Sequence, residues 1–129
     1  MAVAATALAS SVEFPLGSEV VQVQYNLNRS LEVHVRATGD THQALVVFAC
    51  VEAFRVMDER DLFWFWPTCS TPNGWLFEIS SGGWLSEEAD HGTLLPLLQD
   101  IHEFLITGED ACVCVLSVQP PIVTIEPVL

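Results

Sequence analysis

Apolar and polar side chains alternate strictly along the first regular part of the chain. In residues 21–27, Val, Tyr and Leu alternate with Gln and Asn, and residues 31–37 repeat the pattern with Glu, His and Arg at the polar positions. A period of two is typical of a strand with one buried face. Because only residues 28–30 separate the two segments, we predict a β-hairpin with a tight turn.

A longer apolar segment follows this hairpin. Residues 44–51 form a continuous run rich in Val and Phe, and the apolar character carries on through residues 54–57. Such a run predicts a central strand that is covered on both faces. A single strand of this length would be unusual, so we predict a bend or a β-bulge near Glu52-Ala53.

Aromatic residues dominate the middle of the chain. Residues 62–66 read Leu-Phe-Trp-Phe-Trp and are followed by Pro67, which predicts another strand that the proline ends. Residues 75–79 predict a further strand with an apolar face. Turn-forming residues 80–83 then lead into Trp84-Leu85, so we expect a second hairpin there.

The last third of the chain predicts one short helix followed by strands. Thr93 is a suitable N-cap, and leucines at helical spacing follow it, so we predict a helix near residues 93–101. Residues 103–107 fit either an extension of this helix or a strand; we favour a strand paired with residues 111–117 across a tight turn. Residues 122–125 predict a short edge strand.

The order of these elements predicts a mainly β (α+β) fold. Because no long helices alternate with the strands, we expect a curved antiparallel sheet or a partly closed barrel of seven to eight strands, with one short helix near residues 93–101. Residues 19–129 form a single compact β-rich domain in this interpretation. Residues 1–18 lack a regular pattern, so we expect a loose N-terminal tail.

The charge balance excludes several classes of partner. The chain carries 17 acidic residues against four arginines and no lysine, a formal net charge of −13. Nucleic-acid binding depends on Lys and Arg that neutralise phosphates, and anionic membranes attract basic segments, so we expect neither nucleic acid nor a membrane as partner. Opposite potentials speed association, so we expect a basic protein partner.

The sequence contains no predicted membrane helix or targeting segment. No apolar stretch approaches the roughly 20 residues that a membrane helix needs, and the N-terminal segment lacks the basic residues of a secretory signal. The four cysteines are too few for a disulfide scaffold, and free buried cysteines suit a reducing compartment. We therefore expect a cytoplasmic protein.

No motif in the sequence indicates catalysis or metal binding. Cys112 and Cys114 would project from one face of a strand, but their spacing is not that of a zinc site, so we expect both to pack in the core. Neighbours such as His102 and Glu103 would support acid–base chemistry only if the fold brought suitable groups together. We predict no catalytic residue, no metal site and no cofactor.

Two groups of residues remain as candidate binding surfaces. One consists of acidic residues in predicted turns, which a basic partner could reach: Asp58, Glu59, Asp61, Glu87, Glu88 and Asp90. The other consists of tryptophans that are too closely spaced to enter one core together, and that would form an exposed patch or line a pocket: Trp64, Trp66, Trp75 and Trp84.

These features predict a non-enzymatic acidic domain that docks or neutralises a basic protein, by analogy with immunity proteins that block toxins. The alternative is a small-molecule-binding β cup lined by the tryptophans. An uncovered aromatic strand, or the edge strand at residues 122–125, would favour a homodimer.

Overall fold

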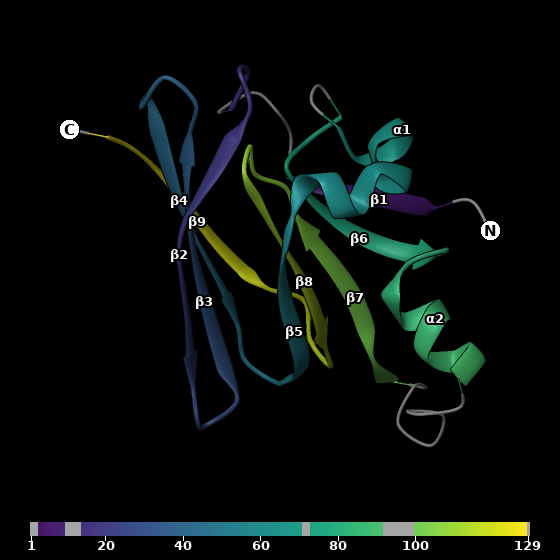
Figure 1. The fold of residues 1–129 in the computed structure, drawn as a ribbon. Coiled ribbons are helices and arrows are strands. Elements are labelled where there is room, and N and C mark those ends of the chain that lie inside the picture. Colours follow the sequence, from purple (N-terminus) through teal and green to yellow (C-terminus); the bar gives the residue numbers. More distant parts are fainter. Residues whose placement is uncertain (1–2, 10–13, 71–72, 92–99, 129) are drawn as a thin grey trace.

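The computed structural model describes residues 3–9, 14–70, 73–91 and 100–128, and nine strands in these ranges form two antiparallel sheets (Figure 1). The five-stranded sheet contains, in spatial order, β1 (Ala4–Ala9), β6 (Leu76–Ser81), β7 (His102–Ile106), β8 (Ala111–Ser117) and β5 (Val51–Asp58). The four-stranded sheet contains β2 (Ser18–Asn26), β3 (Ser30–Ala37), β4 (His42–Phe48) and β9 (Ile122–Pro127). The predicted mainly β, antiparallel fold is confirmed, and the described strands do not close into a barrel.

Three short helices in the described residues cover one face of the five-stranded sheet. The 3-10 helix η1 (Glu59–Phe65) and the helix α1 (Trp66–Cys69) follow β5, and α2 (Trp84–His91) follows β6. Figure 1 shows the helices on the side of this sheet that faces away from the four-stranded sheet, so the molecule has three layers. None of the helices in the described ranges is long and apolar enough to cross a bilayer.

The two sheets pack against each other through an apolar core. Every second side chain of β3 is buried, as the period of two predicts: Leu31, Val33, Val35 and Ala37. Aromatic pairs add to this core. The ring centroids of Phe48 and Phe104 are 5.5 Å apart, and Phe14 stacks on Trp75 at 4.8 Å.

A second core lies between the five-stranded sheet and the helices. Adjacent residues of β7 alternate between the two cores, so that Leu105 faces the helices whereas Phe104 and Ile106 face the other sheet. The helices contribute several of its buried side chains: Leu62, Phe65, Cys69 and Trp84. Because both faces of this sheet are covered, β7 and β8 are buried at nearly every position.

Several predicted elements are present at the expected residues. β2 and β3 form the predicted hairpin. β7 pairs with β8 in antiparallel register, which confirms the strand for residues 103–107. β9 is the predicted edge strand, and its partner in the described sheet is β4.

The apolar segment from residue 44 to residue 57 is divided between the two sheets. β4 ends at Phe48, the chain crosses over, and β5 begins at Val51 in the other sheet. The register between β5 and β8 shifts between Val51 and Ala53, so an irregularity lies at the predicted position. The length that looked excessive for one strand is explained by this crossing.

The strand predicted for residues 62–66 is wrong, because this segment lies in η1 and the first residue of α1. The Asp58 side chain accepts a hydrogen bond from the Arg60 N–H and caps η1. Pro67 lies in the first turn of α1, where its missing N–H leaves no helical hydrogen bond unmade. These local helix signals override the preference of aromatic residues for strands.

The hairpin predicted at Trp84-Leu85 is also wrong, because α2 begins there. Gly82 adopts a φ of 78° directly after β6, which a residue with a Cβ rarely does, and the chain leaves the strand at this point. Most of the helix predicted near residues 93–101 falls on residues 92–99, which lie outside the described residues.

Part of the predicted N-terminal tail takes part in the sheet. Residues 4–9 form β1, which pairs with β6 at one edge of the five-stranded sheet. Val3 and Ala5 pack against the second core, while most of the other side chains of β1 are exposed. The folded domain therefore includes residues that precede position 19.

Candidate protein interface

The helix η1 presents two aromatic side chains to solvent. Phe63 is 70% exposed and Trp64 is 37% exposed, and their rings meet edge to face with centroids 5.5 Å apart. The same helix buries Leu62 and Phe65 against the five-stranded sheet, so the two exposed rings lie on its outer side. Large apolar side chains exposed next to each other are a feature of interaction surfaces.

Acidic residues from two turns meet at the start of the helix that carries these rings. Glu59 and Asp61 are exposed in the first turn of η1. The exposed Glu109 and Asp110 come from the turn between β7 and β8, and the Glu59 N–H donates to the Asp110 carbonyl at 3.4 Å. Together these residues form a surface that we call the acidic–aromatic face: Glu59, Asp61, Phe63, Trp64, Glu109 and Asp110.

Asp58, although predicted as a partner-binding residue, is already engaged. Its carboxylate accepts hydrogen bonds from Nε and Nη2 of Arg60, both at 3.0 Å. These hydrogen bonds hold the pKa of Asp58 below its ordinary value. By contrast, no ion pair between described side chains involves the carboxylates of the acidic–aromatic face, so these four groups carry its uncompensated negative charge.

The third predicted acidic group lies on α2. Glu87 is exposed, whereas the Glu88 carboxylate accepts a hydrogen bond at 2.9 Å from the indole N–H of Trp84. Asp90 lies in the last turn of α2, and its side chain is outside the described set. Figure 1 shows α2 and the η1–α1 segment at different ends of the helical layer, so this group is separate from the acidic–aromatic face.

The four tryptophans lie in different environments. Trp64 is exposed on η1, and Trp66 is half-buried against the second core. Trp75 is buried between the two sheets, and Trp84 is buried where α2 meets the five-stranded sheet. The structure therefore does not bring the four predicted residues together, and one of them contributes to the acidic–aromatic face.

Sequence analysis did not identify a buried carboxylate that holds α2 in place. Glu103 on β7 is 2% exposed, and it accepts hydrogen bonds from the N–H groups of Trp84 at 2.9 Å and Leu85 at 2.8 Å. These are the first two residues of α2, so Glu103 satisfies donors that have no partner within the helix. An acidic residue leading directly into the apolar residues 104–106 is the one signal of this role in the sequence.

Burial shifts the pKa values of Glu103 and of two buried cysteines. It raises the pKa of Glu103 above the ordinary value, while the two N–H donors and Arg55 act in the opposite direction. Burial also raises the pKa of the Cys112 and Cys114 thiols to about 11.

Glu103 and its neighbour His102 lie on opposite sides of β7, and the exposed His102 ring contacts Glu78 at 3.0 Å. No group of three His, Cys, Asp or Glu residues in the described ranges has the arrangement of a metal site.

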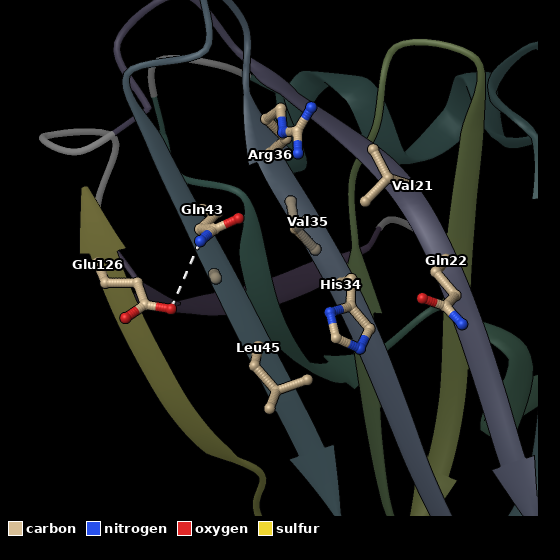
Figure 2. A pocket seen from close by; sticks show the side chains of 9 residues that line it. Val21, Gln22, His34, Val35, Arg36, Gln43, Leu45 and Glu126 are labelled. Atoms are coloured by element: carbon tan, nitrogen blue, oxygen red, sulfur yellow. Dashed lines mark hydrogen bonds between the residues drawn. The ribbon is translucent and has the colours of Figure 1, made fainter. Parts of the chain in front are cut away.

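Among the cavities lined by described residues are a larger groove and a smaller cavity, and neither of these has a tryptophan in its lining. A groove of about 390 Å³ lies on the outer face of the four-stranded sheet (Figure 2). A smaller cavity of about 170 Å³ lies beside the acidic–aromatic face and is lined in part by Glu59, Glu109, Ser18 and Thr107. The sequence gives no local signal for either, because each is built from segments far apart in the chain.

Comparison with known proteins identifies no relative: no protein family, no curated protein and no solved structure matches the chain.

Proposed function

We propose that this chain is a non-enzymatic acidic domain that binds a basic protein partner through the acidic–aromatic face. The observation that carries the proposal is the exposed pair of Phe63 and Trp64 beside carboxylates that have no ion-pair partner among the described side chains. Aromatic side chains are enriched among the residues that dominate binding energy at protein interfaces. The surrounding charges steer an oppositely charged partner and raise the association rate.

The small cavity beside this face supports a basic partner. Its lining includes Glu59 and Glu109, whose carboxylates are hydrogen-bond acceptors. It also includes Ser18 and Thr107, whose hydroxyls donate to the carbonyls of Thr107 and Trp75 and so present their lone pairs as acceptors. Lysine and arginine side chains carry donors and no acceptor. A basic side chain of the partner therefore complements the cavity in both charge and hydrogen bonding.

The biological role of this binding is inferred by analogy with immunity proteins. Neutralising a basic toxin, as immunity proteins do, needs a compact acidic domain with a binding face, and this chain has that character. The cysteines are free in the described residues, which suits a cytoplasmic protein. The tryptophan-lined cup gains less support, because the tryptophans lie in separate environments.

The proposal is tested by capture of basic proteins on the immobilised chain. We expect proteins captured from a lysate at low salt to be released at high salt, because exposed charges are screened. The double variants Phe63→Ser/Trp64→Ser and Glu59→Gln/Asp61→Asn should each lower the affinity for a captured protein by about tenfold or more.

Matched controls lie elsewhere on the surface. Glu19→Gln/Asp100→Asn makes the same change in net charge at exposed positions, and Leu27→Ser removes a side chain that is 96% exposed at the tip of the β2–β3 hairpin. We expect both controls to bind like the unmodified chain. If the face variants and the control variants lost binding equally, the binding would result from overall charge or non-specific hydrophobic adsorption and not from the acidic–aromatic face.

A further inference from the structure

No described helix or strand covers the outer face of the four-stranded sheet, since the described helices lie on the far side of the molecule (Figure 1). Its outward side chains form three rows across the strands, because the pairing register aligns them: Glu19-Arg36-Gln43-Glu126, Gln22-His34-Leu45-Thr124, and Gln24-Glu32-Val47-Ile122. Successive rows are about 7 Å apart, since outward residues on β3, β4 and β9 are two positions apart. We call this surface the open sheet face.

Charge on the open sheet face is arranged along the inner strand β3. Glu32, His34 and Arg36 follow one another on the outer side, so one end of the strand is negative and the other positive. The Nε atom of Arg36 is buried and has no hydrogen-bond partner among the described residues. Its ion pair with Asp40 is long, with 3.9 Å between nitrogen and oxygen. The Arg36 side chain as a whole is 43% exposed, so its outer guanidinium N–H groups can donate hydrogen bonds to a carboxylate from outside the chain.

A groove beside Arg36 leaves room for such a carboxylate. Its lining residues belong to β2, β3, β4 and β9 (Figure 2), and its volume is about 390 Å³. The groove is lined by both apolar and polar residues, and the polar ones include hydrogen-bond donors and acceptors: Gln22, His34, Arg36, Gln43 and Glu126. Side chains that project from a facing surface fit into this space.

We infer that the open sheet face binds a second copy of the chain, with the two sheets face to face. The two-fold axis lies between the sheets and runs along the row of His34, across the strands. This axis reverses the strands of the second copy and places Arg36 of each copy over Glu32 of the other. A two-fold interface must be complementary to itself. Glu32 and Arg36 meet this requirement because they lie at equal distances on either side of His34.

The charges also select this axis over the other face-to-face arrangement. An axis parallel to the strands would place Glu19 of one copy over Glu126 of the other, so that two carboxylates would repel. The axis along the His34 row pairs Glu19 with Gln24 and Glu126 with Ile122, which brings no like charges together. The strands of the two facing sheets run along a common direction, as in the usual packing of two sheets.

The size of the face sets the strength of the dimer. Four strands spaced about 4.8 Å apart and about seven residues long cover roughly 450 Å² per copy in projection. A standard interface buries about 800 Å² of accessible surface per partner. The dimer is therefore weak and depends on concentration. It uses other residues than those of the acidic–aromatic face, so it does not rest on the proposed function.

A charge swap tests the inference. Light scattering or sedimentation is measured from about 10 μM to about 1 mM at physiological salt. We expect the mass of the unmodified chain to rise from one copy to two over this range. Arg36→Glu and Glu32→Arg should each remain single at every concentration. The double variant should again form the dimer, because Glu at position 36 then faces Arg at position 32 of the other copy.

The swap separates contacts between copies from contacts within one chain. Glu32 and Arg36 are four residues apart on one strand, about 13 Å, so their exchange cannot restore an ion pair inside the chain. Thermal unfolding of all variants verifies that they fold. A chain that stays single at the highest concentration would overturn the inference, as would single variants that dimerise like the unmodified chain or a folded double variant that does not recover.

Discussion

The guanidinium carbon of Arg55 lies 4.4 Å from the centroid of the Trp84 indole ring. Arg55 belongs to β5 and Trp84 to α2, so the contact joins an edge strand to the helix that covers the sheet. The positive charge of Arg55 also favours the ionised form of the buried Glu103. One side chain therefore supports both the ring and the carboxylate that hold α2.

Replacing Arg55 should destabilise the fold through both contacts. We expect Arg55→Met, which keeps most of the aliphatic stem, to lower the free energy of unfolding by about 1–2 kcal/mol. Urea denaturation measures the change. Arg60→Met is the control, because Arg60 is exposed and pairs only with Asp58 at the surface, so it should have little effect. Equal effects of the two substitutions would contradict a special role for the stacked arginine.

Gly83 is predicted to tolerate no side chain while Glu103 is present. A Cβ atom at position 83 would overlap the Glu103 carboxylate. We expect Gly83→Ala to lower the free energy of unfolding by about 1–3 kcal/mol. A double-mutant cycle with Glu103→Ala checks the cause, because the alanine at position 83 should cost little once the carboxylate is gone. Additive effects would show that the cost of Gly83→Ala has another origin.

Glu103 should make stability depend on pH in a defined direction. Because burial raises its pKa in the folded state, its contribution to stability is fully present below the ordinary glutamate pKa and is lost as pH rises through the folded pKa. We expect the stability of the unmodified chain relative to Glu103→Gln to fall as the pH rises above the ordinary glutamate pKa of about 4.3 towards neutrality. Taking the difference removes the effects of the other carboxylates, which both proteins share. A constant difference over this range would contradict the prediction.

The cysteines should differ in reactivity. Burial raises the pKa of Cys69 to about 12 and that of Cys112 and Cys114 to about 11, so few thiolates are present near neutral pH. Cys50 is only half-buried. We expect iodoacetamide to modify Cys50 first in the folded protein and all four residues at similar rates in denaturant, as followed by mass spectrometry. Early modification of Cys112 or Cys114 would show that the second core opens readily.

Patterns within single segments predicted much of the fold. The β2–β3 hairpin follows from the alternation of residues 21–37, which reflects one buried and one wet face. The strand at residues 103–107 was harder to identify, because both of its faces are covered and an apolar run has no period. The expected pairing with residues 111–117 across a tight turn favoured a strand over an extension of the helix.

Features that depend on distant segments were not predictable. The crossing between β4 and β5 leaves no break in the apolar run, because each half is buried in its own sheet. The aromatic residues 62–66 suggested a strand, whereas the Asp58 cap and Pro67 direct a helix. Within the acidic–aromatic face, Glu59 and Asp61 were predicted as acidic-turn residues and Trp64 as an exposed aromatic. Glu109 and Asp110 join this face because β5 pairs with β8, which brings the turn before β8 next to the start of η1.

The position of β9 beside β4 has a consequence for synthesis of the protein. About 70 residues separate these strands in the chain, and at roughly 5–20 residues per second the ribosome takes several seconds to make them. During that interval β4 presents an unpaired apolar edge, which is a template for pairing with other nascent chains. The four-stranded sheet is therefore completed only after β9 has been made, and aggregation through the edge of β4 is a hazard of that interval.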